Sequence, residues 1–165
     1  MATKTNFTPD EWKMVLSSPM LAGMAVTLAE PSGIFGLMKE GMASGMAVMK
    51  AKSDAGASEL AKALEADMET SEGRSAAQDG LKSSLTGKTP DEIKQQVMAG
   101  LTRVGQILDS KAAPDAPAFK AWLKHVAEEV AEAASEGGFL GFGGVKVTDA
   151  ERASIQEVAA ALGTR

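Results

Sequence analysis

The sequence predicts an all-α protein, folded as a single helical bundle without a sheet. Two observations favour this class: a Thr-Pro-Asp-Glu helix start occurs twice, and apolar residues recur at spacings of three and four. A third observation is that no segment alternates between apolar and polar residues, and β-branched residues are sparse, so that a sheet has little to build from. We expect about seven or eight helices in one domain covering residues 1–165.

The clearest helix starts are capping boxes. Thr8 can cap the first free amides of a helix, Pro9 suits the first helical position, and Glu11 can reach back to the amide of the cap. The same four residue types recur from Thr89, and a related box begins at Thr148. Three helix N-termini are therefore predicted.

Two prolines predict further starts, because proline is tolerated in the first helical turn and disfavours helical conformation in the residue before it. Pro19 predicts a short helix over about 19–29, and Pro31 predicts a longer one over about 31–51. We expect these two helices to pair as a central buried hairpin.

The remaining helices are predicted from apolar stripes. Ser58 can cap one helix and Pro117 can open another. Between 70 and 88 the chain is polar and rich in small residues, which predicts a flexible connection holding a short helix near 76–84. The most regular stripe consists of Ile93, Val97, Leu101, Val104 and Leu108.

Composition excludes several classes of function. The chain carries 17 Lys and Arg against 22 Asp and Glu, a formal charge of -5, and its basic residues form no cluster. Nucleic-acid binding needs a concentrated positive face, so we expect no nucleic-acid partner. With no Cys, no Tyr and one His, and no nucleophile motif, catalysis has little support and we expect no cofactor. A catalytic site that only the tertiary fold assembles stays open as the alternative.

Location follows from the apolar segments. The N-terminal residues lead into a capped helix and not into the apolar run of a secretory signal, so we expect a cytoplasmic protein. Glu30 and Pro31 interrupt the most apolar region, and Lys39 adds a charge within it. A membrane-spanning helix needs about 20 consecutive apolar residues, and membrane insertion is not expected.

Methionines form the first candidate site. Met38, Met42, Met46 and Met49 share one face of the expected 31–51 helix. Thioethers can bind Cu(I), and a flexible Met face also suits a binding groove. We favour a third interpretation, burial in the core, because an apolar helix face is usually buried.

The lone histidine gives the second candidate. His125, Glu129, Glu132 and Glu136 can share one helix face, which is the beginning of a metal site built from imidazole and carboxylate groups. A di-iron bundle needs two Glu-x-x-His motifs, and one His cannot supply them. We favour a solvated face of an amphipathic helix.

A glycine-rich run at 137–145 gives the third candidate. Glycine-rich backbone before a helix can cradle phosphate, but the phosphate-binding motifs are not matched here. We favour a helix end at Gly137 and a tight connection that buries Phe139, Leu140 and Phe142. The alternative is an exposed apolar loop that contacts a membrane or a partner.

Several of these segments together resemble a known group of proteins. The segments 7–12, 30–33, 89–92 and 136–151 resemble an uncharacterised family of small all-helical bacterial proteins. This resemblance implies a bacterial helical protein and brings no activity or site residues. The expected helix count and acidic charge are also similar to those of TerB-like stress proteins.

The sequence therefore leads to three hypotheses of function. The first is a non-enzymatic helical interaction protein or stress-associated protein, working with another protein or as a homo-oligomer. The second is metal binding by the His125 and Glu129 face or by the Met face. The third is association with a membrane surface through the 139–142 loop. The candidate interaction surface consists of Phe139, Leu140, Phe142, Met42 and Met46.

Overall fold

The computed structural model describes residues 2–29, 58–87, 89–136 and 147–164. These residues form six α-helices and one short 3-10 helix, with no strand among them, which confirms the all-α prediction. The described part of the chain thus holds slightly fewer helices than the seven or eight expected. The elements are η1 (Lys4–Asn6), α1 (Pro9–Thr27), α3 (Glu59–Met68), α4 (Ser71–Ser84), α5 (Pro90–Lys111), α6 (Ala116–Glu136) and α7 (Asp149–Leu162).

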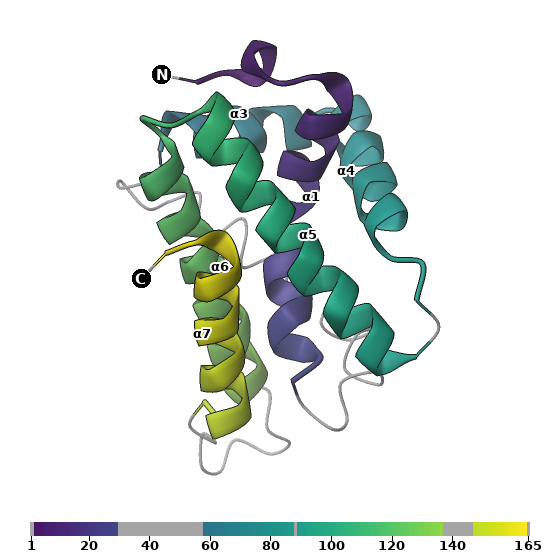
Figure 1. The fold of residues 1–165 in the computed structure, drawn as a ribbon, viewed down its shortest axis with the longest axis vertical. Coiled ribbons are helices and arrows are strands. Elements are labelled where there is room, and N and C mark those ends of the chain that lie inside the picture. Colours follow the sequence, from purple (N-terminus) through teal and green to yellow (C-terminus); the bar gives the residue numbers. More distant parts are fainter. Residues whose placement is uncertain (1, 30–57, 88, 137–146, 165) are drawn as a thin grey trace.

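Helix α1 lies at the centre of the bundle. The helices α4, α5, α6 and α7 all pack against it. Figure 1 shows α5 crossing it, with α4 on one side and the neighbouring helices α6 and α7 on the other. Even small and polar residues of α1 are buried, among them Ser17, Ser18 and Gly23. A helix that is covered on all sides needs apolar or small residues around its whole circumference, and α1 has them after its charged first turns.

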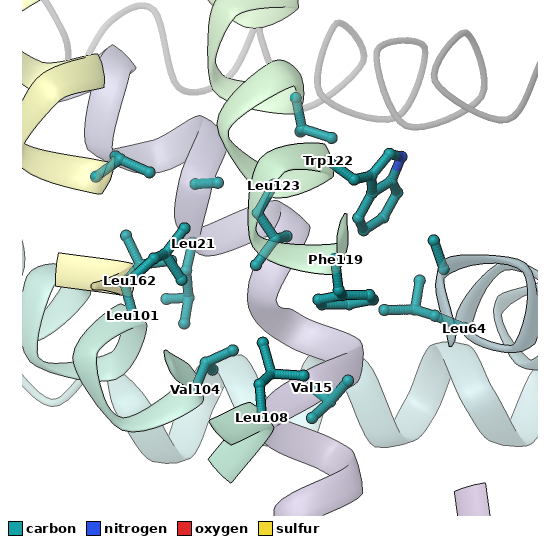
Figure 2. Packing of buried hydrophobic residues seen from close by; sticks show 14 of the residues in the cluster. Val15, Leu21, Leu64, Leu101, Val104, Leu108, Phe119, Trp122, Leu123 and Leu162 are labelled. Carbon is teal, nitrogen blue, oxygen red and sulfur yellow. The ribbon is translucent and has the colours of Figure 1, made fainter. Parts of the chain in front are cut away.

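The core is formed where α5 and α6 face α1 (Figure 2). Phe119 and Leu123 of α6 are fully buried, and the ring of Phe119 packs against that of Trp122 with centroids 5.2 Å apart. The stripe predicted on α5 is confirmed, since four of its members are fully buried and the first is partly buried. These residues are Val97, Leu101, Val104 and Leu108, preceded by Ile93.

The three predicted capping boxes are confirmed. At the start of α1, the Glu11 amide donates to Thr8 Oγ1 at 3.3 Å, and the Thr8 amide donates to Glu11 Oε2 at 2.8 Å. The same reciprocal bonds are present at Thr89 and Thr148. Ser58 caps α3 as predicted, so that local side-chain chemistry fixes four helix starts.

The prediction that a helix starts at Pro19 is wrong, because α1 continues through this residue. Proline lacks the amide that would donate to the carbonyl four residues earlier, here that of Val15. The hydroxyl of Ser18 donates to this oxygen at 2.6 Å, and that of Ser17 donates to Met14 O at 2.9 Å. Ser18 thus supplies a donor to the one carbonyl that the proline leaves without its helical amide.

The segment after α3 is more helical than the sequence indicates. The short helix expected near 76–84 is α4, which begins already at Ser71 with Thr70 as its cap. Its residue Gly80 lies directly on α1, where a Cβ would overlap with the carbonyl oxygen of Lys13. The small residues that resemble a connection in the sequence therefore allow two helices to approach closely.

The N-terminal segment is attached to the bundle by contacts with α1, with α3 and with the connection between α5 and α6. The indole of Trp12 donates to Asp67 Oδ2 at 2.6 Å, and Lys4 Nζ lies 3.0 Å from the same oxygen. The ring of Phe7 packs against that of Trp12 with centroids 5.5 Å apart. The amide of Ala2 donates to a carboxylate oxygen of Asp115 at 2.6 Å.

The expected helix over 31–51, and with it the second half of the expected central hairpin, lies outside the described residues. None of the helices in the described ranges is both long enough and apolar enough to cross a bilayer.

Candidate functional site

The described residues form a groove between α4 and α5, next to α1. Both helices pack on α1 but make little contact with each other, so that a space of about 300 Å³ remains above α1. Figure 1 shows α5 crossing α1 while α4 lies beside it. We call this space the α4–α5 groove; its lining residues are Met14, Ser83, Ser84, Gln96, Ala99, Gly100 and Arg103.

Glycines determine how close the groove lies to α1. Gly80 brings α4 against the backbone of α1 at Lys13. On the other wall, a Cβ at Gly100 would lie 3.0 Å from Leu21 Cδ1, so that α5 is also close to α1. Both walls therefore approach the central helix at a glycine, and Met14 of α1 lines the groove between them.

One end of the groove offers hydrogen-bond acceptors. The hydroxyls of Ser83 and Ser84 both donate to Gly80 O, at 2.8 and 2.9 Å. Each hydroxyl oxygen keeps its lone pairs, so that it can accept a hydrogen bond from a ligand. Ser84 is also the last residue of α4, and the C-terminus of a helix carries a partial negative charge.

Gln96 lies at this end of the groove, and its side-chain amide is hydrogen-bonded to the connection between α4 and α5. Its Oε1 accepts from the amides of Thr86 and Gly87 at 2.7 and 2.8 Å, and its Nε2 donates to Thr86 Oγ1 at 3.2 Å. These three bonds hold the connection between α4 and α5. Gln96 therefore has a structural role in the groove.

Arg103 places a cation at the other end. Its side chain is exposed, and within the described part of the chain no hydrogen bond or ion pair holds its guanidinium. The carboxyl group of Glu11 has a lowered pKa, first because the Thr8 amide donates to it, and further because Lys111 and Arg103 lie nearby. Glu11 is engaged by its capping bond and by Lys111 Nζ at 3.9 Å, so that the donors of Arg103 remain available.

An exposed row without charges runs along α5 at the edge of the groove, and Ala99 belongs to both. Gln95, Ala99, Thr102 and Gln106 are all exposed and share one face at helical spacing. Thr102 satisfies its own hydroxyl by donating to Met98 O at 3.0 Å. Exposed helix faces normally carry charged residues, and we call this uncharged row the α5 face.

The His125 cluster lies on α6 and is partly exposed. His125 Nδ1 lies 3.6 Å from Glu128 Oε2, and Nε2 lies 3.7 Å from Glu129 Oε1. Glu132 is exposed farther along α6, and the side chain of Glu136 lies outside the described residues. In the ranges that the structure describes, no three or more His, Cys, Asp or Glu side chains form a group that could hold a metal. Metal binding by His125, Glu129 and Glu132 stays a prediction.

The other sequence candidates lie outside the described residues. These are the methionine face with Met42 and Met46, and the loop with Phe139, Leu140 and Phe142. The methionines of α1, which are Met14, Met20 and Met24, pack at the edge of the core. The interaction surface expected at the loop and the Met face stays a prediction.

In the described residues, the fold and the groove together define a class: an all-helical bundle with an open groove beside its central helix. Comparisons with known proteins found no matching family, no matching curated protein and no matching solved structure. The resemblances to an uncharacterised bacterial family and to TerB-like proteins therefore stay predictions.

Sequence reasoning missed the groove and the α5 face. Arg103 and Met14 are far apart in the sequence and meet only because α5 packs on α1. A signal for the α5 face was present, since the residues opposite the buried stripe of α5 include the uncharged Gln95, Ala99, Thr102 and Gln106. The groove had no comparable signal, because its walls are joined only in three dimensions.

Proposed function

We propose that this chain is a non-enzymatic interaction protein that associates with a second copy of itself through the α5 face. The supporting observation is that four consecutive exposed positions on this face carry no charge. In a two-fold symmetric contact the same residues from both copies lie opposite each other. A charged residue near the axis would therefore face its own like charge, and the α5 face avoids this repulsion.

The dimensions of the face suit a contact between two helices. From Gln95 to Gln106 a helix rises about 16 Å at about 1.5 Å per residue, which is the length of a short helix–helix contact. Ala99 and Thr102, at the centre of the row, are small, and small side chains let helix axes approach to about 8 Å.

This proposal is a form of the first hypothesis from the sequence, a protein that acts by interacting with other proteins or with itself. A role in a stress response belongs to the same hypothesis. The alternatives are metal binding by His125 and Glu129 or by the Met face, and membrane contact through the 139–142 loop. Both stay predictions from the sequence, since they rest on residue patterns and on segments outside the described ranges.

The mass of the full chain in solution, measured across a wide concentration range by sedimentation equilibrium, tests the proposal. We expect a reversible monomer–dimer equilibrium. The double substitution Thr102→Glu with Gln106→Glu places like charges opposite each other across the two-fold axis. We expect the dimer dissociation constant to rise roughly tenfold, since like charges in close contact near a protein surface repel by about 1 kcal/mol or more.

The matched control is Ser75→Glu with Gln78→Glu on α4, where both residues are also exposed. This pair introduces the same residue type and the same net charge on a different surface. It should leave the dimer dissociation constant within about twofold of the wild-type value. A chain that stays monomeric at millimolar concentration, or a dimer weakened equally by both double variants, would overturn the proposal.

A further inference from the structure

We infer that the α4–α5 groove binds a small zwitterion, that is, a molecule with one ammonium group, one carboxylate group and a short apolar chain, such as a free amino acid. The inference concerns the interior of the groove, and it does not depend on self-association through the α5 face. Three features of the groove lead to this class of ligand: its hydrogen-bond acceptors, its free cation, and its size.

The acceptor end recognises an ammonium group. Ser83 and Ser84 have both committed their hydroxyl protons to Gly80 O, at 2.8 and 2.9 Å. Their oxygens can then only accept hydrogen bonds, and an ammonium group has only donors to offer. The C-terminal end of α4, at Ser84, adds the negative end of a helix dipole, which favours a cation.

The opposite end recognises a carboxylate. The guanidinium of Arg103 has five donors in a planar fork, and this geometry matches the two oxygens of a carboxylate. Arg103 follows Gln96 by seven positions on α5, or two helical turns, so that it lies about 10 Å along the helix axis from the closed end. Since the neighbouring Glu11 is already held by Thr8 and Lys111, a ligand carboxylate is the partner that Arg103 lacks among the described residues.

The middle of the groove is apolar and small. Met14 lies on the floor, with Ala99 and Gly100 on the α5 wall. The volume of about 300 Å³ is at the lower limit of ligand pockets, which range over about 300–1,000 Å³. A ligand of this size has room for its two charged groups and a short aliphatic chain, for which the flexible Met14 side chain offers an adaptable contact.

Three small molecules test the inference, two of which each lack one charged group of the first. L-norvaline carries both charged groups, pentanoate lacks the ammonium group, and butylamine lacks the carboxylate group. Each is titrated into the 15N-labelled full chain to tens of millimolar, and the amide resonances of Ser84, Ala99 and Gly100 are followed. We expect saturable shifts with norvaline, and an affinity at least roughly tenfold lower for each of the other two, since one charge-assisted interaction is lost.

Substitutions at the two ends assign the two groups. Arg103→Gln should weaken norvaline and pentanoate binding roughly tenfold and leave butylamine binding unchanged. Ser83→Ala with Ser84→Ala should weaken norvaline and butylamine and leave pentanoate unchanged. The control Arg74→Gln removes a guanidinium that bonds the carbonyls of Met68 and Glu69 at the other end of α4, and it should change none of the three affinities.

The result that overturns the inference is a norvaline titration without saturable shifts at the groove, or with shifts that persist fully in Arg103→Gln. Equal affinities for norvaline and pentanoate would also overturn it, because the groove would then recognise a carboxylate alone. Repeating the titration with Thr102→Glu and Gln106→Glu present separates the two proposals: a groove that binds norvaline in this variant is independent of the dimer.

Discussion

The hydroxyl of Ser154 in α7 donates a hydrogen bond of 2.6 Å to the backbone oxygen of Ala25 in α1. Both residues are buried, with 1% and 0% of their surface exposed. Ala25 lies near the end of α1, where carbonyls lose their helical partners, and the amide of Ala29 donates to Val26 O at 3.0 Å. Ser154 thus supplies a donor at the end of α1 and joins α7 to the central helix.

Replacing Ser154 by alanine should lower the free energy of unfolding by about 1–3 kcal/mol, because the buried oxygen of Ala25 loses this donor. Chemical denaturation followed by circular dichroism measures the change. The control Ser110→Ala removes a hydroxyl that bonds Ile107 O within its own helix, at a residue that is exposed overall. It should cost less than about 0.5 kcal/mol. Equal losses in the two variants would contradict the role given to Ser154.

The bond between Ser18 and Val15 leads to a prediction of coupling with Pro19. Ser18→Ala in the wild-type chain leaves the buried Val15 oxygen without a donor and should cost about 1–3 kcal/mol. In a Pro19→Ala background the new amide at position 19 can bond this oxygen, so that the same Ser18→Ala substitution should cost much less. The coupling energy from this double-mutant cycle should reach about 1–2 kcal/mol. Additive effects would show that Ser18 does not compensate for the proline.

Pro19 also shows where prediction from the sequence reaches its limit. A capping box is complete within four residues, so that Thr8, Thr89 and Thr148 predict helix starts correctly. A proline has two interpretations, a helix start or a position inside a helix, and the serines before it decide between them. The local signal was present as Ser-Ser-Pro, and its meaning depends on the burial of α1.

The candidate site was less predictable than the helices. Glycine has a low helix propensity, so Gly80 and Gly100 are unfavourable helix residues in the sequence. In the structure, each marks a position where a helix packs close to α1. Which helix lies opposite a glycine is decided by the tertiary fold, and so is the meeting of Met14 with Arg103. The buried stripe of α5, by contrast, follows from its own periodicity, and four of its five predicted members are fully buried.

Two glycines of α5 should respond differently to the same substitution. A Cβ at Gly105 would lie 2.9 Å from the backbone oxygen of Leu162 in α7, whereas one at Gly100 would meet only the flexible end of Leu21 at 3.0 Å. Both alanines gain about 1 kcal/mol of helix propensity. Gly105→Ala should still lose about 1–3 kcal/mol, because backbone cannot move aside as a side chain can, while Gly100→Ala should be neutral or stabilising. Thermal unfolding of the pair measures this, and the reverse order would contradict the close packing of α5 on α7.

Asp67 predicts that the stability of the fold decreases at acidic pH. Burial raises the pKa of its carboxyl group, but the hydrogen bond from Trp12 and the contact with Lys4 outweigh burial, so that the pKa is lowered overall. A carboxyl group with a lowered pKa in the folded state stabilises the protein above its unfolded pKa of about 3.9. This contribution is lost as the pH falls below about 4 and through the folded pKa.

The variant Asp67→Asn tests this dependence, because an amide oxygen can still accept from Trp12 while the charge is gone. At pH 7 it should lower the free energy of unfolding by about 1 kcal/mol, since a bond to a charged acceptor is stronger than one to a neutral acceptor. Between about pH 5 and pH 2, the range around the unfolded pKa of an aspartate, the free energy of unfolding of this variant should fall less steeply than that of the wild type. Asp79→Asn makes the same charge change at an exposed position of α4 and serves as the control at pH 7.

The outcome that would contradict this prediction is an acid dependence of Asp67→Asn that matches the wild type. Other carboxyl groups would then cause the loss of stability in acid, and the contact of Asp67 with Trp12 and Lys4 would have no part in it.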